Sequence, residues 1–318
     1  MSSELSKYIL ATLAYYDVVD YPLTGFEIWK YLTTHNSETG DHNAQHFSLV
    51  AILDELENEN LKKIIETYRG FYFLLGRKNL VEQRIRRNKL AEEKYKRLLK
   101  VVNILRFAPY VRMIAATGRL AMKNTEKKSD LDLLVVLEHG KIFTGRILVT
   151  LFVHLLGKRR YRGKIANRVC LNYFITTNSL EIGLKDIYSS SEYYFMVPLF
   201  GLETSREFQE KNSWIKNYKA NYQRENTLSL KALSDTFLTK VIRGIVEAIC
   251  GFDFIEKFLK KIQLKRIMKN PKTHQAGSMV VANDEALIFL PSPQGPKIYD
   301  KFQDRLSSLA KHHANLNI

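Results

Sequence analysis

The chain has 318 residues, 45% of them hydrophobic and 26% charged, which is typical of a folded globular protein and excludes a disordered or fibrous one. Lysine and arginine outnumber aspartate and glutamate by 49 to 33, and the resulting net charge of +16 favours nucleic acids or nucleotides as partners. Two cysteines, Cys170 and Cys250, exclude a disulfide framework and a cysteine zinc site. The start resembles no secretory signal, and the longest apolar run, 147–156, is about half of a membrane span, so we expect a cytoplasmic protein without a membrane partner.

Residues 1–78 have the pattern of a winged helix-turn-helix domain. Apolar residues recur at helical spacing in 5–16, Thr24 and Glu27 have the spacing of a capping box, and helical periodicity returns in 47–56. Two β-prone runs then flank a Tyr-Arg-Gly turn, which predicts a hairpin. Three helices followed by a hairpin is the order of a winged helix, and we predict that fold for this domain.

The partner of the first domain stays open between DNA and protein. In a winged helix the third helix, here 47–57, faces the major groove of DNA. Its exposed positions include Asp54, Glu55 and Glu57, whose negative charges repel phosphates. Winged helices also dock proteins, so both partners are retained as alternatives.

Residues 79–108 are predicted to form a basic, amphipathic linker helix. Its apolar face consists of residues three or four positions apart, namely Ala91, Tyr95, Leu98, Val102 and Leu105. The basic faces suit either a solvated helix that connects two domains or a surface that binds a phosphate backbone.

The segment 157–168 is a second basic stretch, with six basic residues and no acid. The same two alternatives apply to it, although the aromatic Tyr161 among the cations favours contact with nucleic acid or a triphosphate. The candidate nucleic-acid-binding residues are Arg159, Arg160, Arg162 and Lys164.

The segment 111–137 carries the strongest chemical pattern. A short apolar strand runs into Thr117 and Gly118, where glycine lets the backbone turn sharply and approach an anion before a helix that begins near Leu120. After a cationic stretch, Asp130 and Asp132 enter a β-branched strand, and strand alternation places both carboxylates on one face. Such a pair needs a neutralising cation, and hard oxygen ligands favour Mg²⁺ or Mn²⁺.

This pattern resembles the nucleotidyltransferase superfamily of the DNA polymerase β type, whose signature is a strand, a glycine turn, a gap and Asp-x-Asp on the next strand. Gly118, Asp130 and Asp132 match those positions. The whole chain also resembles a family of uncharacterised bacterial nucleotidyltransferase-domain proteins. The segments that carry this likeness are YYDVVDYPLTGFEIWKYL, RVCLNYFIT, DIYSSSEYYFMVPLFG and KNSWIKNY.

The resemblance implies a mixed sheet backed by helices, in which Asp130 and Asp132 hold the metal ions and a third carboxylate on a later strand activates the attacking hydroxyl. It implies that the Gly118 turn cradles a nucleoside triphosphate. The nucleotide-binding candidates are Thr117, Gly118, Arg119, Lys123, Lys128 and Ser129.

The sequence departs from the family pattern at two positions. Arg119 replaces the usual Ser or Gly, and it either clamps a phosphate or blocks the turn. On the strand 169–175 the best-placed polar residue is Asn172, which can ligate a metal but cannot act as a base. Glu181 and Asp186 can replace it only if the chain folds back. A capping box is expected from Ser189 to Glu192.

These patterns predict an α+β protein with four parts: a winged-helix domain in 1–78, a basic linker helix in 79–108, a nucleotidyltransferase core in 109–202, and a mainly helical domain in 203–318. The function expected first is metal-dependent transfer of a nucleoside monophosphate from a triphosphate to a hydroxyl of RNA (such as a tRNA end), protein or a small molecule. The alternative is a non-catalytic DNA- or protein-binding regulator with a degenerate nucleotide-binding fold.

Overall fold

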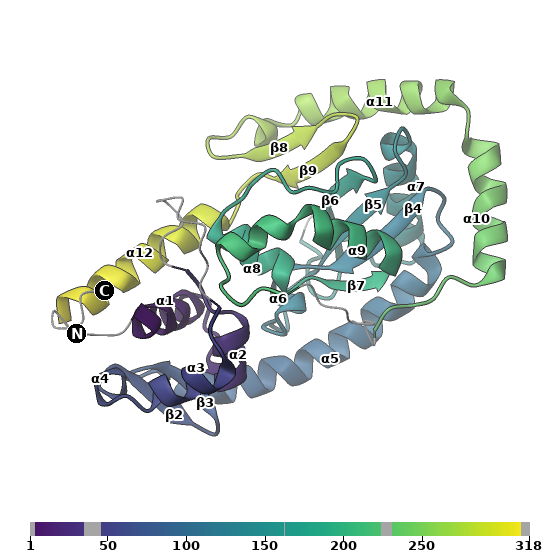
Figure 1. Cartoon of the computed structure of the whole chain (residues 1–318). Helices are drawn as coiled ribbons and strands as arrows, with labels where there is room; N and C mark the ends of the chain where they lie inside the picture. The colour runs from purple at the N-terminus through teal and green to yellow at the C-terminus, as the bar shows by residue number, and fades with distance from the viewer. Residues whose placement is uncertain (1–3, 35–45, 162, 224–230, 313–318) are drawn as a thin grey trace.

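The computed structural model describes residues 4–34, 46–161, 163–223 and 231–312. These residues form a mixed α/β protein in which N-terminal helices with a small sheet, a long helix and a six-stranded mixed sheet with helices follow one another (Figure 1). The predicted α+β class with a mixed sheet is therefore confirmed, while the assignment of its parts to particular fold families stays a prediction. In the described residues no helix combines the length and the apolar character that crossing a membrane requires.

The N-terminal part of the chain, in its described residues, contains four helices and a three-stranded antiparallel sheet. In chain order it comprises α1 (Glu4–Val18), β1 (Leu23–Thr24), α2 (Gly25–Lys30), α3 (Leu49–Leu56), α4 (Glu59–Lys62), β2 (Ile65–Tyr68) and β3 (Phe71–Leu74), with strand order β1-β3-β2. The predicted capping box is present: Glu27 N donates to Oγ1 of Thr24, and Thr24 N donates to the Glu27 carboxylate. The predicted hairpin is also present, although α4 was not expected.

Helix α5 (Asn79–Leu105) lies between this N-terminal part and the central sheet in the chain (Figure 1). Its five predicted apolar positions are all buried, because they pack on the strands and on α7 (Ile142–Leu155). The apolar face of this helix is thus confirmed. Two of its cations, Arg84 and Lys94, are nevertheless buried, and Nζ of Lys94 donates to the backbone oxygen of Ser129 at 2.7 Å.

The central sheet has the order β7-β4-β5-β6-β9-β8. Its strands are β4 (Val111–Ala116), β5 (Leu131–Leu137), β6 (Val169–Thr176), β7 (Val197–Phe200), β8 (Met279–Ala282) and β9 (Ala286–Leu290). β5 and β6 are parallel, and the other pairs are antiparallel. The side chains of β5 alternate between two apolar clusters, one on each face of the sheet, which is the pattern of a buried central strand.

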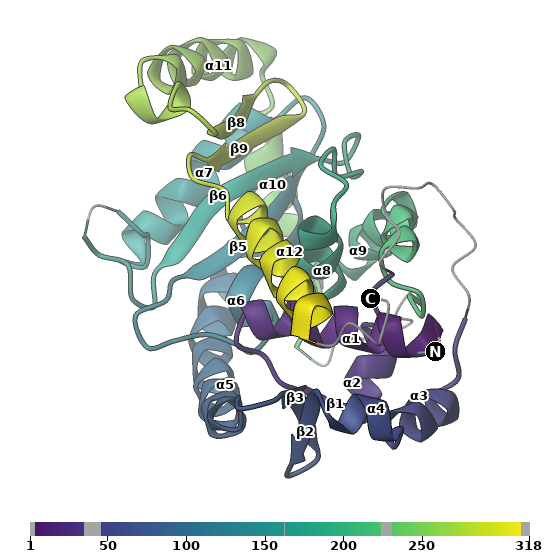
Figure 2. The same cartoon turned by 90° about the vertical axis from the view of Figure 1, so that its left-hand side faces the viewer.

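The segment 203–318 is distributed over the whole molecule. Helix α9 (Leu202–Lys211) packs on β4 and β7, helices α10 (Phe237–Cys250) and α11 (Asp253–Met268) follow on the outside, and the β8–β9 hairpin extends the sheet. The last helix, α12 (Gly295–His312), returns to α1 (Figure 2). There Phe302 packs on Tyr15 with ring centroids 5.5 Å apart, and Arg305 lies 2.9 Å from Asp17. Amphipathic periodicity shows that a helix needs a packing partner, but it does not identify that partner.

Candidate metal and nucleotide site

The candidate site lies where β4 ends and β5 begins. Thr117 N donates to the backbone oxygen of Asp132 at 3.2 Å, and the chain then turns at Gly118 into α6 (Gly118–Ala121). Gly118 has φ +62°, and a Cβ atom built there would lie 3.1 Å from Oδ2 of Asp132. Glycine is therefore required twice, for the left-handed backbone and for the close approach to the carboxylate. The short helix begins at Gly118, two residues before the predicted Leu120.

Asp130 and Asp132 lie together as strand alternation predicted, and Cys170 joins them. One ligand atom from each of the three side chains lies within 4.8 Å of the others. Cys170 reaches this cluster because it is the β6 residue paired with Asp132 in the parallel ladder. The two carboxylates are partly buried, and the thiol is buried.

The electrostatics of this cluster favour a bound cation. Burial, followed by the charge of Asp130, raises the pKa of Asp132 to about 6. Burial and the two carboxylates raise the pKa of the Cys170 thiol to about 12, so this side chain keeps its proton at neutral pH. The donor set therefore fits a divalent cation held by carboxylate oxygens, as Mg²⁺ and Mn²⁺ prefer, more closely than a thiolate-bound metal.

Arg160 supplies a positive charge from within the chain. Its Nη1 lies 2.5 Å from Oδ2 of Asp130 and 3.3 Å from Sγ of Cys170. The segment 157–168 brings Arg160 there because it folds back along β6, where Arg159 forms a bridge with Val169. Arg160 was expected to bind nucleic acid; in the structure it contacts Asp130 and Cys170.

A third carboxylate acts on the site from α8 (Ile187–Tyr194). Burial, and next the charge of Asp132, raise the pKa of Glu192 to about 7, whereas a hydrogen bond with Tyr188 opposes this shift. Glu192 lies outside the 4.8 Å cluster, but its charge interacts with Asp132. Sequence reasoning missed this residue because nothing local connects it with a strand 60 positions earlier.

The expected capping box from Ser189 to Glu192 was wrong. The helix begins one turn earlier, and Asp186 caps it by accepting a hydrogen bond from Ser189 N at 2.6 Å. Asp186 is therefore occupied as a cap, and Glu181 forms an ion pair with Lys185 at 2.6 Å. Neither residue contributes to the carboxylate cluster.

Asn172 is not the residue opposite the diacid. The ladder between β5 and β6 shifts its register after the pair Asp132–Cys170 and resumes at Leu134–Tyr173, so Asn172 lies in a bulge. Strict alternation along β6 would place Asn172 on the same face as Cys170, which is why the sequence favoured it. A bulge interrupts that alternation. The catalytic role of Asn172 stays a prediction.

Two of the three predicted phosphate-binding cations form ion pairs away from the diacid. Arg119 forms an ion pair with Glu126 at 2.7 Å, and Lys123 forms one with Glu92 at 2.9 Å. Ser129 Oγ accepts a hydrogen bond from the backbone of Glu126, and Lys128 is exposed. Of the remaining basic candidates, Lys164 lies 5.6 Å from the ring centroid of Tyr161, and Arg162 lies outside the described residues.

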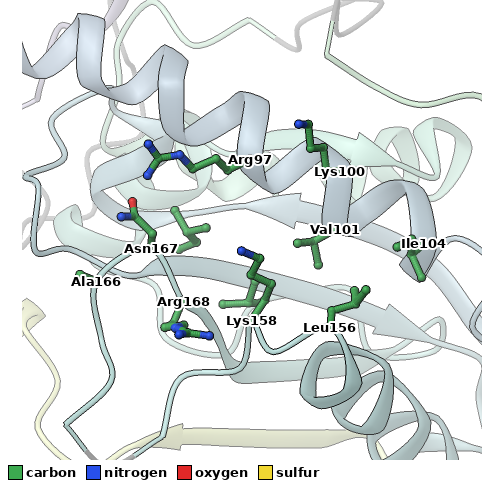
Figure 3. Close-up of a pocket in the computed structure, with 11 residues that line it drawn as sticks. Arg97, Lys100, Val101, Ile104, Leu156, Lys158, Ala166, Asn167 and Arg168 are labelled. Carbon is green, nitrogen blue, oxygen red and sulfur yellow. The ribbon is translucent and has the colours of Figure 1, made fainter.

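A pocket of about 490 Å³ opens on the other side of the same strand ends, between α5 and the segment after α7 (Figure 3). It includes Leu131, the residue between the two aspartates, and Val169, which precedes Cys170. The pocket and the carboxylate cluster therefore lie on opposite faces of one sheet edge.

Comparison with known proteins gives no relative: no family model matches the chain, and no curated protein or solved structure matches it either. The function is therefore inferred from the geometry of the site alone.

Proposed function

We propose that this protein is a metal-dependent nucleotidyltransferase, which moves a nucleoside monophosphate from a nucleoside triphosphate to a hydroxyl acceptor. The observation that supports this proposal is the pairing of Asp130 and Asp132 at the start of β5, directly beneath the Gly118 turn. Two partly buried carboxylates repel each other unless a cation lies between them, and perturbed pKa values cluster at functional sites.

Asp130 and Asp132 are the residues that would hold Mg²⁺ or Mn²⁺. A divalent ion bound there would neutralise the phosphates and stabilise the charge that develops during transfer. The missing side chain at Gly118 leaves the backbone close to Asp132, so phosphate oxygens can approach the carboxylates along the turn. Arg160, already beside Asp130, is placed to exchange its carboxylate partner for a phosphate oxygen.

In the proposed reaction the acceptor oxygen attacks the α-phosphorus of the triphosphate. A new P–O bond forms, the bond to the bridging oxygen breaks, and pyrophosphate leaves with the electron pair. The hydroxyl proton passes to Glu192, whose pKa of about 7 suits a general base near neutral pH. Glu192 thereby takes the part that the family pattern gives to a third strand carboxylate.

A non-catalytic function is the second candidate, and two contacts favour it. The guanidinium of Arg160 lies where it neutralises Asp130, and the strand position opposite Asp132 holds Cys170 instead of a carboxylate. In that case the N-terminal domain would bind DNA or a protein, and the sheet would serve as a nucleotide-binding or structural module.

The test is incubation of the full chain with each α-labelled nucleoside triphosphate, Mg²⁺ or Mn²⁺, and total RNA. The control is the Asp130→Asn/Asp132→Asn double variant. We expect label on RNA or protein with the wild type only. No transfer, together with no metal-dependent nucleotide binding in calorimetry, would leave the non-catalytic function.

A further inference from the structure

The two basic segments of the chain, 79–108 and 157–168, meet in the pocket of Figure 3. Helix α5 contributes Arg97 and Lys100 from one side, and Lys158 and Arg168 lie on the other. No acidic residue lines the pocket among the described residues.

These four cations differ from two arginines at the start of α5, which have carboxylate partners. Earlier in α5, Arg84 pairs with Glu27 at 2.6 Å and Arg87 pairs with Glu126 at 2.9 Å. In the part of the chain that the structure describes, no ion pair neutralises any of the four pocket cations. Four like charges around one pocket repel each other, and an anionic ligand would remove that repulsion.

The interior of the pocket is suited to more than inorganic phosphate. Its floor is apolar and comprises Val101, Ile104, Leu131, Leu156 and Val169. Asn167 adds a buried Oδ1 atom that has no hydrogen-bond partner among the described residues. Phosphates at the cationic rim, an apolar ring face on the floor and an amino or hydroxyl donor for Asn167 are together the features of a nucleotide.

The position of the pocket indicates a strand rather than a free nucleotide. The segment 157–168 provides Lys158 and Arg168 to the pocket, and it also provides Arg160, which contacts Asp130 on the opposite face of the strand ends. A chain of phosphates can follow this segment from one face to the other, whereas a single nucleotide cannot occupy both.

We propose that this basic pocket holds the phosphodiester backbone of a single-stranded nucleic acid, whose 3′ hydroxyl is the acceptor at Asp130 and Asp132. The evidence for strand binding is the pocket itself, whereas the role of the 3′ hydroxyl as acceptor rests on the proposed function. RNA and DNA both present a sugar–phosphate backbone, and the experiment distinguishes between them.

The experiment measures fluorescence anisotropy of labelled single-stranded RNA and DNA oligonucleotides with the full chain in EDTA. We expect Arg97→Glu/Lys100→Glu to weaken binding at least tenfold and to reduce the slope of log K against log salt by about 1.4, since about two phosphate contacts are lost. The control, Lys261→Glu/Lys265→Glu on exposed positions of α11, changes the net charge equally and should bind like the wild type. Circular dichroism checks that each variant folds. If the charge-reversal variant does not fold, Arg97→Gln/Lys100→Gln is used in its place.

Equal losses in the pocket and control variants, or no binding by the wild type, would overturn the proposal. The Asp130→Asn/Asp132→Asn variant should bind the strand as the wild type does. Binding without any transfer would retain the pocket and remove only the acceptor role, so failure of the binding site and failure of the proposed function give different results.

A different observation concerns α10, which packs with its polar side inward. Arg243 lies 2.5 Å from Asp235, Glu247 lies 2.8 Å from Arg112, and Thr239 is fully buried. These contacts fix the rotation of the helix and turn its apolar side to the outside. The helix itself lies at the edge of the molecule (Figure 1). A helix normally buries this side.

The outward apolar side continues onto α11. Its largest members, with their exposed fractions, are Phe237 (84%), Leu238 (60%), Ile245 (56%), Ile249 (64%), Phe254 (69%) and Phe258 (62%). Together they expose on the order of 700 Å², given the size of aromatic and aliphatic side chains. The largest patch on a typical monomer covers roughly 300–600 Å², and each partner in a standard interface buries about 800 Å².

We infer that a second copy of this chain covers this patch, with α10 packed on α10 across a two-fold axis. An apolar surface is complementary to itself, and within the described residues α10 exposes only Lys240 as a charge, whereas α11 also exposes Lys257 and Lys261. The contact is therefore assigned to α10, where the surface is nearly uncharged. A Cβ added at Gly244 would have no neighbour within 4 Å, and this exposed glycine lets two helices approach closely.

The oligomeric state tests this inference. Light scattering after size exclusion should give twice the 37.0 kDa chain mass for the wild type, and the chain mass for Ile245→Asp/Ile249→Asp. Leu155→Asp is the control, because Leu155 is 75% exposed on α7 and should leave the dimer intact. A monomeric wild type at tens of micromolar, or a dimer that survives the α10 substitutions, would overturn the inference.

Discussion

Arg160 and Asp130 form an ion pair with Nη1 2.5 Å from Oδ2, and the same nitrogen lies 3.3 Å from Sγ of Cys170. A single cation of the chain thus contacts two of the three groups in the candidate metal cluster. Any divalent ion that binds Asp130 must compete with this guanidinium, so the ion pair links metal affinity to the position of the segment 157–168.

Removing this competitor should strengthen metal binding. We expect Arg160→Met to bind Mn²⁺ about tenfold more tightly than the wild type, which corresponds to roughly 1.4 kcal/mol. The measurement is Mn²⁺ titration followed by electron paramagnetic resonance. Arg168→Met, in the same segment but in the pocket, should leave the affinity unchanged. Equal or weaker Mn²⁺ binding by Arg160→Met would show that the guanidinium does not compete.

The same variant should transfer nucleotides more slowly if Arg160 moves onto a phosphate. Tighter metal binding combined with a lower rate would separate the two roles of this side chain, because simple disruption of the site would weaken both.

The raised pKa of Asp132 predicts a pH dependence of stability in EDTA. The folded pKa of about 6 lies above the ordinary value of 3.8, so the folded state binds the proton more tightly than the unfolded state. The stability contribution of the protonated carboxyl is therefore present below pH 4 and lost as pH rises to about 6, at a cost of about 3 kcal/mol.

Replacing this carboxylate should therefore stabilise the chain at neutral pH. We expect Asp132→Asn to raise the free energy of unfolding by about 1–2 kcal/mol at pH 7.5 and to leave it nearly unchanged at pH 4, as measured by urea denaturation. Asp284→Asn, on an exposed turn, is the control. A variant that is less stable than the wild type at pH 7.5 would contradict the raised pKa.

Glu192 should determine the acid limb of the pH–rate profile of the transfer reaction. With a pKa of about 7, this carboxylate loses its proton-accepting ability as the pH falls below neutrality. We expect Glu192→Gln to lower kcat by about 10²–10⁴-fold and to remove the ionisation near pH 7 from the pH–rate profile. Glu203→Gln, on the exposed side of α9, should retain both. A profile that keeps its acid limb in Glu192→Gln would assign the base to another group.

Gly118 and Gly157 allow backbone strain to be separated from contact with the site. Their φ angles are +62° and +63°, but a Cβ atom meets Asp132 only at Gly118 and has no neighbour at Gly157. Alanine at either position should lower the free energy of unfolding by about 1–2 kcal/mol. Only Gly118→Ala should also weaken Mn²⁺ binding and transfer, because only there must the carboxylate move. Equal effects of the two substitutions on metal affinity would argue against a role for the Gly118 turn.

The features that the sequence by itself determined depend on neighbours a few residues apart. The capping box of Thr24 and Glu27 and the apolar face of α5 were predictable, because helical geometry relates positions three and four apart. The proximity of Asp130 and Asp132 follows in the same way from the two-residue repeat of a strand. The mixed α+β class follows from the alternation of such patterns along the chain.

Only the tertiary structure decided which residues complete the site. The parallel pairing of β5 and β6 placed Cys170 opposite Asp132, and the bulge after that pair moved Asn172 out of register. Arg160 and Glu192 reached the diacid from other elements. Only the tertiary structure decided, in the same way, that α12 packs on α1 and that the apolar side of α10 faces outward. Local periodicity determines which face of an element is apolar, but contacts between distant segments depend on how all the elements pack together, and no spacing along the chain encodes them individually.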